Sequence, residues 1–356
     1  MLTLDDIAGQ REAVDLLRRL LRSGRVPQAL LFRGPEGVGK ATTARTFAAA
    51  LMCDADGTAA CGRCASCVLN ERETHPDYLR VGRLTRQEIK NKENSRLFTQ
   101  VAGAAEGDLA SRILVDQIRK LTGIVGFRPR QGRRRVALID PADRMNREAQ
   151  NGLLKTLEEP PAGSLVILIS ARPHLLLPTV RSRCFSIGFS TMRVTELSAL
   201  LERRGMPPDE AAARAALSGG SLGRALELDL EVRRGRRREI LEMLDTLSSS
   251  PAAIEKLPAM AASLAGKDDA TLVDALDLSQ SLLRDAARCG VADARGALLH
   301  ADLYARLDPI AARLGPHRAA SLVQCIDRLR ADLRFNTNRV LTAEALLAAV
   351  AGGPLP

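Results

Sequence analysis

A glycine-rich stretch near the N-terminus, Gly34-Pro-Glu-Gly-Val-Gly-Lys-Ala41, nearly matches the phosphate-binding loop G-x-x-x-x-G-K-[ST]. In that loop, backbone N–H groups and the lysine hold phosphates, and the hydroxyl binds Mg²⁺. The glycines and the lysine are present here, but Ala41 replaces the hydroxyl residue. This departure predicts a degenerate nucleotide site. Its candidate binding residues are Gly34, Gly37, Gly39, Lys40, Thr42 and Asp140.

The acid of this set, Asp140, follows the apolar run 136–139 and could order Mg²⁺. The next position, where a carboxylate would polarise the attacking water, holds Pro141. Asp143 lies two residues further on and is expected to point elsewhere. Losing both a metal ligand and the activating group should slow hydrolysis by many orders of magnitude. ATP or ADP binding through backbone amides and Lys40 could survive, weak or vestigial, so no independent ATPase activity is expected.

Four cysteines with the spacing C-x₇-C-x₂-C-x₂-C come soon after the glycine-rich loop. Two overlapping C-x₂-C steps can bring thiolates around one ion, and four thiolates close a tetrahedral zinc shell. Such a site leaves no open position for water and is therefore expected to be structural. An iron–sulfur cluster is the alternative, which the absence of other redox signs disfavours. The candidate ligands are Cys53, Cys61, Cys64 and Cys67, and nearby His75 is expected to be a turn residue.

Two arginines in the segment 179–184, Arg181 and Arg183, approach the last apolar run of the first half of the chain. The simpler interpretation is that they pair with local acids. The alternative is an arginine finger that enters a neighbouring subunit's ATP site. Ser170, at the end of the run 165–169, could either sense a γ-phosphate or cap its strand.

The elements that must position these residues are short apolar runs separated by helical stretches. Such runs are typical of buried strands in a parallel α/β sheet. They lie at 29–32, 78–81, 136–139, 165–169 and 185–189. Strand signals stop near residue 190, and Ala- and Leu-rich helical patterns follow. The predicted domains are a P-loop α/β domain at 1–190, a helical lid at 191–232 and an all-α domain at 233–356. The first includes a zinc module at about 53–77 and a basic insertion at about 81–135.

The chain has 356 residues and a net charge of +10, much of it in residues 81–135, with 13 Lys/Arg against 5 Asp/Glu. A basic excess suits an anionic partner such as nucleic acid, but a solvated surface is an equal alternative. Aromatic residues make up only 3% of the chain, which argues mildly against base stacking. A second basic run, 233–238, is expected to be an exposed helix start. No signal peptide or membrane-spanning run is recognisable, so a cytoplasmic location is expected.

Several motifs together resemble the clamp-loader branch of the AAA+ ATPases. They are Asn151-Gly-Leu-Leu-Lys-Thr-Leu-Glu-Glu-Pro-Pro161, Ser182-Arg-Cys184, the cysteine cluster, His75-Pro-Asp77 and Asn336-Thr-Asn-Arg-Val-Leu341. The combination is similar to the delta-prime subunits of the bacterial DNA polymerase III clamp loader. The resemblance covers nearly the whole chain and is most specific between residues 34 and 184.

The resemblance implies an AAA+ fold that no longer hydrolyses ATP and acts as a stator in DNA replication. It implies that Arg183 reaches the ATP of an adjacent subunit, and that residues 233–356 join a pentameric collar. The partners it implies are gamma/tau and delta subunits within the polymerase III holoenzyme, a nucleotidyltransferase complex, with primer–template DNA met through the assembly. Active relatives carry an arginine in the lid where this chain has Gly223. That is a third lost catalytic element.

Two alternatives stay open at this stage. The first is an ATP-hydrolysing subunit of the gamma/tau type, against which Ala41, Pro141 and Gly223 argue. The second is a stand-alone basic nucleic-acid-binding protein with a zinc module, which would leave Arg183 without a purpose.

Overall fold

The computed structural model describes residues 2–55, 58–84, 112–131, 133–267, 269–289, 298–333 and 337–354. It contains two compact units, Met1–Glu227 and Leu228–Pro356. The predicted lid therefore belongs to the first unit as far as Glu227. The three-domain division at 190 and 232 stays a prediction. About half of the predicted basic insertion, residues 85–111, lies outside the described residues.

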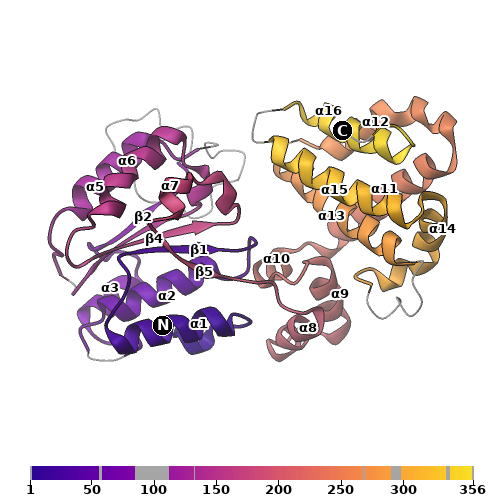
Figure 1. The fold of residues 1–356 in the computed structure, drawn as a ribbon. Coiled ribbons are helices and arrows are strands. Elements are labelled where there is room, and N and C mark those ends of the chain that lie inside the picture. Colours follow the sequence, from indigo (N-terminus) through magenta and orange to yellow (C-terminus); the bar gives the residue numbers. More distant parts are fainter. Residues whose placement is uncertain are drawn as a thin grey trace. The chain divides into compact units, whose positions relative to one another are not determined.

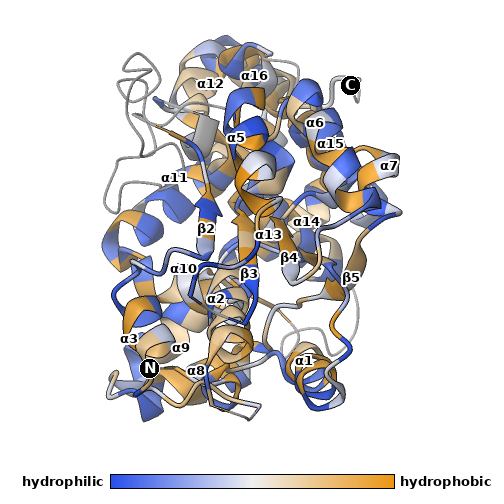
Figure 2. Ribbon diagram, turned by 90° about the vertical axis from the view of Figure 1, so that its left-hand side faces the viewer, coloured by the Kyte–Doolittle hydropathy of each residue, from blue (hydrophilic) through white to orange (hydrophobic). Residues whose placement is uncertain are grey.

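A five-stranded parallel sheet forms the centre of the first unit, in the order β2-β3-β4-β1-β5. The five predicted strands and their parallel arrangement are confirmed. β3 and β4 consist wholly of buried residues, which explains their continuous apolar sequences. Both are mainly orange in the hydropathy colouring of Figure 2. The strands are β1 (Ala29–Arg33), β2 (Tyr78–Val81), β3 (Arg135–Ile139), β4 (Ser164–Ser170) and β5 (Phe185–Gly188).

Helices cover both faces of this sheet (Figure 1). On one face, Leu17 of α1 and Phe47 of α2 pack against β1, β3 and β4. On the other face, Ile118 of α5, Leu153 of α6 and Val180 of α7 enter a second apolar cluster. The helices are α1 (Arg11–Ser23), α2 (Lys40–Met52), α3 (Ala65–Glu71), α5 (Val115–Val125), α6 (Arg147–Glu158) and α7 (Pro178–Arg181).

Three short helices complete the first unit around a small core of their own. Leu197 and Leu201 of α8 pack there against Ala211 and Ala215 of α9, and Ala225 of α10 joins them. We call this group the lid. Its helices are α8 (Val194–Arg203), α9 (Pro208–Leu217) and α10 (Leu222–Glu227).

The second unit is built from helices around one large apolar core, which confirms the predicted helical C-terminal region. The expectation of an exposed basic helix start at 233–238 is wrong in part. Arg233, Arg236 and Arg237 lie within α11, and their side chains are only 11–18% exposed. They pair with acids of the same unit. The helices are α11 (Leu230–Ser249), α12 (Leu257–Ala265), α13 (Asp269–Cys289), α14 (Tyr304–Leu314), α15 (Pro316–Asp332) and α16 (Arg339–Val350).

Among the described residues, no helix is both long enough and apolar enough to cross a membrane.

Candidate functional site: a degenerate nucleotide loop and an exposed arginine

The glycine-rich loop lies between β1 and α2, the strand–loop–helix context that a phosphate-binding loop needs. Gly39 precedes the first residue of α2, Lys40, so the predicted phosphate-binding residues gather at a helix N-terminus. Ala41 packs against the core below, and Thr42 is half-buried. The adjacent hydroxyl, that of Thr43, donates to the carbonyl of Gly39 at 2.8 Å.

The Lys40 ammonium turns back onto its own loop. Lys40 is 6% exposed, and its Nζ donates to the carbonyl oxygens of Gly34, at 2.6 Å, and Pro35. Burial lowers the pKa of Lys40, while the Asp140 and Glu36 carboxylates oppose that shift. The lysine can reach a phosphate only by giving up these two carbonyls.

The lid contacts this loop through backbone groups. The amide of Gly223 donates to the carbonyl of Gly37 at 2.8 Å, and Ser221 Oγ donates to the carbonyl of Glu36 at 2.9 Å. Gly37 has a φ of 72°, and a Cβ there would lie 2.3 Å from Ser221 Oγ. A Cβ at Gly223 would lie 2.9 Å from the Gly37 carbonyl oxygen. Only glycine at both positions allows this close approach.

The lid arginine that active relatives are expected to carry is absent at position 223, and the next residue is Arg224. Arg224 also lies beside the loop: its Nη2 is 3.7 Å from the Glu36 carboxylate, and a Cβ at Gly37 would lie 3.5 Å from its Cγ. Both side chains are largely exposed. The loss of a nucleotide-sensing arginine from the lid stays a prediction.

The C-terminal ends of β3 and β4 carry the remaining candidates. Asp140 directly follows β3, and burial raises its pKa, against the opposing charges of Arg80 and Lys40. Ser170 is fully buried, and its Oγ donates to Asp143 Oδ1 at 2.7 Å. Asp143 also accepts the amide of Ala171 at 3.2 Å. Ser170 Oγ also accepts the amide of Arg172 at 3.0 Å, as a cap at the end of a strand would.

The predicted arginine-finger segment lies on the opposite face of the sheet, at α7. Val180 is fully buried, whereas Arg181 and Arg183 are exposed. Gln150 of α6 fixes the approach to α7, because its Oε1 accepts the amide of Leu177 at 2.7 Å. The structure thus places Arg183 apart from the chain's own glycine-rich loop, on a surface that the buried residues hold in place.

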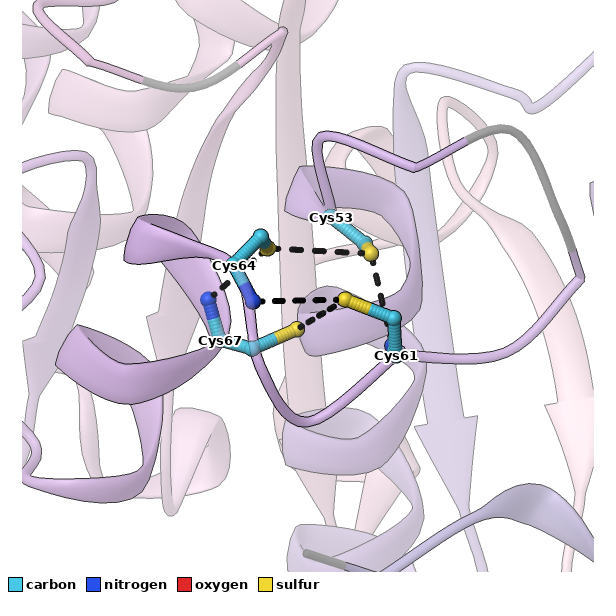
Figure 3. A group of neighbouring side chains, drawn as sticks. All are labelled: Cys53, Cys61, Cys64 and Cys67. Carbon is cyan, nitrogen blue, oxygen red and sulfur yellow. Dashed lines mark hydrogen bonds between the residues drawn. The ribbon is translucent and has the colours of Figure 1, made fainter.

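The four predicted zinc ligands converge in a group whose sulfurs all lie within 4.8 Å of one another (Figure 3). The sulfurs of Cys53 and Cys64 are 3.9 Å apart, as are those of Cys61 and Cys67. A tetrahedral zinc with bonds of about 2.3 Å requires sulfur separations of about 3.8 Å. The cluster therefore fits a zinc ion.

Backbone amides support the charge that these thiolates would carry. The amides of Cys61, Cys64 and Cys67 each point at a cluster sulfur at 3.4 Å. Hydrogen bonding from the Arg63 amide lowers the pKa of Cys61 to about 6, whereas burial raises that of Cys67 to about 12. Burying the Cys67 thiolate is thus unfavourable unless a cation compensates it. His75 stays outside the group, and its Nδ1 accepts the Asp77 amide, as a turn residue would.

Sequence reasoning missed one buried ion pair. Asp77 and Arg135 are 0% and 2% exposed, and their side chains meet at 2.7 Å. Asp77 also accepts the backbone amides of Arg130 and Gln131, and Arg135 donates to the carbonyls of Ile124, Phe127 and Arg128. The only available signal was an arginine at the start of an apolar strand, and it was masked because Arg135 ends the basic run 133–135.

The chain is similar to subunits of DNA polymerase III. The family model described as "DNA polymerase III, delta subunit" matches residues 9–193, about half of the chain. The DNA polymerase III subunit delta' of Pseudomonas aeruginosa is 37% identical over 60% of this chain and 59% of its own length. Subunit tau of Salmonella typhimurium is 30% identical over 81% of this chain but only 41% of its own. The chain thus spans less than two thirds of either relative.

A gamma subunit-related protein of Thermotoga maritima aligns over 95% of this chain and 98% of its own, with 18% identity and a TM-score of 0.36. That similarity is too loose for a residue-by-residue comparison. The family match over residues 9–193 includes the glycine-rich loop, the cysteine cluster and the arginine segment. The chain therefore belongs to the DNA polymerase III delta-subunit family.

Proposed function

We propose that this chain is a non-catalytic, delta-prime-type subunit of the DNA polymerase III clamp loader. It assembles with gamma/tau and delta subunits, supports the loading of the sliding clamp during DNA replication, and donates Arg183 to a neighbour's ATP site. The cysteine cluster holds a structural zinc, and the chain's own glycine-rich loop is vestigial.

The observation that carries this proposal is the contact between Gly223 and Gly37. An AAA+ lid in an active subunit offers an arginine to the nucleotide, whereas this lid offers a backbone amide to the loop itself. The 2.8 Å hydrogen bond joins the lid directly to the glycine-rich loop. Hydrolysis additionally lacks the Mg²⁺ ligand at Ala41 and the activating carboxylate at Pro141.

The position of Arg183 supports action on another subunit. It is exposed and follows α7, between Val180 and Cys184, which pack into the apolar cluster on the face of the sheet opposite to α1 and α2. A guanidinium that neutralises the charge developing on a transferred phosphoryl group is worth a factor of about 10³–10⁵ in rate in related nucleotide hydrolases. A subunit can therefore contribute strongly to a neighbour's hydrolysis while having no hydrolysis of its own.

The test begins with ATP turnover by the purified chain alone, which should stay at background. Reconstitution with gamma/tau and delta subunits should then give DNA-stimulated ATPase activity that Arg183→Ala lowers. Arg181→Ala is the matched control, because Arg181 is also exposed and two residues away.

Two results would overturn the proposal. Magnesium-dependent turnover near 1 s⁻¹ by the isolated chain, at the low end of enzyme rates, would instead identify a gamma/tau-type ATPase. Equal loader activity with Arg183→Ala and Arg181→Ala would show that Arg183 does not act as an arginine finger.

A further inference from the structure

Arg183 already has a carboxylate partner within its own chain. Its Nη2 lies 2.6 Å from Oε1 of Glu158, the last residue of α6, and its Nη1 donates to the carbonyl of Thr179 at 2.9 Å. Their neighbours Glu159 and Arg181 are exposed as well, and neither forms an ion pair with another described residue. The pairing thus selects one of two adjacent acids and one of two nearby arginines.

Buried contacts fix the backbone on both sides of this pair. Leu157, beside Glu158, is buried in the same apolar cluster as Val180 of α7, and Cys184 packs against that cluster. Gln150 of α6 binds the backbone at Leu177 through a 2.7 Å hydrogen bond. The two charged side chains therefore meet because α6 and α7 are held together beneath them.

The ion pair between Arg183 and Glu158 is weak enough for another anion to replace the carboxylate. The Arg183 and Glu158 side chains are 35% and 49% exposed, and water screens ion pairs at such sites. A guanidinium forms stronger, charge-assisted hydrogen bonds with phosphate when both enter an interface from which water is excluded. The phosphate group of a nucleotide can therefore displace the Glu158 carboxylate from Arg183.

We propose that Glu158 is a positioning residue that holds the Arg183 guanidinium until a neighbouring subunit's triphosphate replaces it. This inference rests on the proposed function, since it requires Arg183 to act on that nucleotide. Glu158 competes with phosphate for the same N–H groups, so its charge weakens the engagement of the finger. Arg183 then leaves its own subunit only when a highly anionic ligand is present.

The effect is measurable as a change in the ATP concentration that the assembled loader needs. Glu158→Gln keeps the size and polarity of the side chain and removes its charge. The KM for ATP should fall by about 1.5- to 5-fold, the range that exposed ion pairs correspond to, with kcat unchanged. Glu159→Gln, the matched control, should leave both constants as in the wild type.

A double-variant comparison ties the effect to Arg183. In the Arg183→Ala background, Glu158→Gln should change neither constant, because the competing guanidinium is gone. Thermal melting of the isolated variants checks that Glu158→Gln and Glu159→Gln fold equally well. A merely structural role for Glu158 would instead lower the melting temperature and leave the KM unchanged.

Three outcomes would overturn the inference while Arg183→Ala still impairs the loader. They are an unchanged KM in Glu158→Gln, a raised KM or lowered kcat in that variant, and a lowered KM that persists without Arg183. If Arg183→Ala has no effect of its own, the proposed function fails, and the exchange fails with it.

Discussion

The carboxylate of Asp77 and the guanidinium of Arg135 meet at 2.7 Å in a fully buried site, 58 residues apart in sequence. Arg135 begins β3, and Asp77 directly precedes β2, the neighbouring strand. Together they bind the backbone from residue 124 to residue 131, which leads from α5 into β3. The pair thus fixes the edge of the sheet and the loop that precedes its central strands.

Breaking this pair should strongly destabilise the first unit. Arg135→Met leaves the Asp77 charge buried without its partner, and it also frees three backbone carbonyls. Removing one partner of a buried ion pair costs about 3–5 kcal/mol. The free energy of unfolding should fall by that amount when urea unfolding is monitored through hydrogen exchange of the β3 and β4 amides. Arg134→Met, at the neighbouring half-buried arginine, should change stability by less than about 0.5 kcal/mol. Equal stabilities of the two variants would contradict this prediction.

The close contact of the lid with the glycine-rich loop gives a second prediction. An alanine at position 223 would put its Cβ 2.9 Å from the Gly37 carbonyl oxygen and 3.0 Å from the Gly37 Cα. These are backbone atoms, so the lid must move. We expect Gly223→Ala to cost about 1–3 kcal/mol and to speed hydrogen exchange at residues 218–227.

Gly123→Ala provides the control for that experiment. Gly123 lies in α5, where an added Cβ meets nothing within 4 Å. The alanine should leave stability unchanged or raise it by up to about 1 kcal/mol, because alanine favours helix more than glycine. If Gly223→Ala behaves like Gly123→Ala, the lid does not depend on the Gly37 contact.

The sheet could be predicted from the sequence because buried parallel strands are continuous apolar runs. The run 165–169, for example, became β4 with one residue added at each end. The cysteine cluster was predictable for a similar reason, since three of its four ligands lie within seven residues. Both signals are local.

The contacts around the candidate nucleotide site are not local. Ser221 reaches the Glu36 carbonyl across 185 residues, and no sequence pattern marks which backbone group a serine will meet. Glu158 belongs to a motif that the sequence reveals, yet its ion pair with Arg183 and not with Arg181 depends on how α6 packs beside α7. The sequence thus predicted which catalytic groups are missing, whereas the contacts of Gly223, Ser221 and Glu158 became visible only in the structure.

A buried histidine in the second unit predicts a pH dependence of stability. His300 is 2% exposed; its Nε2 lies 2.9 Å from Ser281 Oγ, and Asp285 accepts its backbone amide at 2.7 Å. Burial lowers the pKa of His300 to about 4, and the charge of Arg237 acts in the same direction. The unfolded chain therefore takes up the proton first as the pH falls below about 6.5.

The second unit should consequently lose about 2–3 kcal/mol of stability between pH 6.5 and pH 4, and none of this effect should appear above pH 7. Urea unfolding monitored by hydrogen exchange of α13 measures it. His300→Gln should flatten the dependence within this window, whereas His317→Gln, at an exposed position of α15, should retain it. Parallel curves for His300→Gln and the wild type would show that His300 is not the titrating group.

Metal analysis tests the cysteine cluster. The sulfur separations of 3.9 Å predict about one zinc per purified chain. Cys64→Ser should abolish zinc binding, because its sulfur contacts that of Cys53 and accepts the Cys67 amide. Hydrogen exchange in α3, which begins one residue after Cys64, should then become faster. Cys184→Ala, outside the cluster, should keep the metal, and zinc retained at full occupancy by Cys64→Ser would contradict the four-thiolate site.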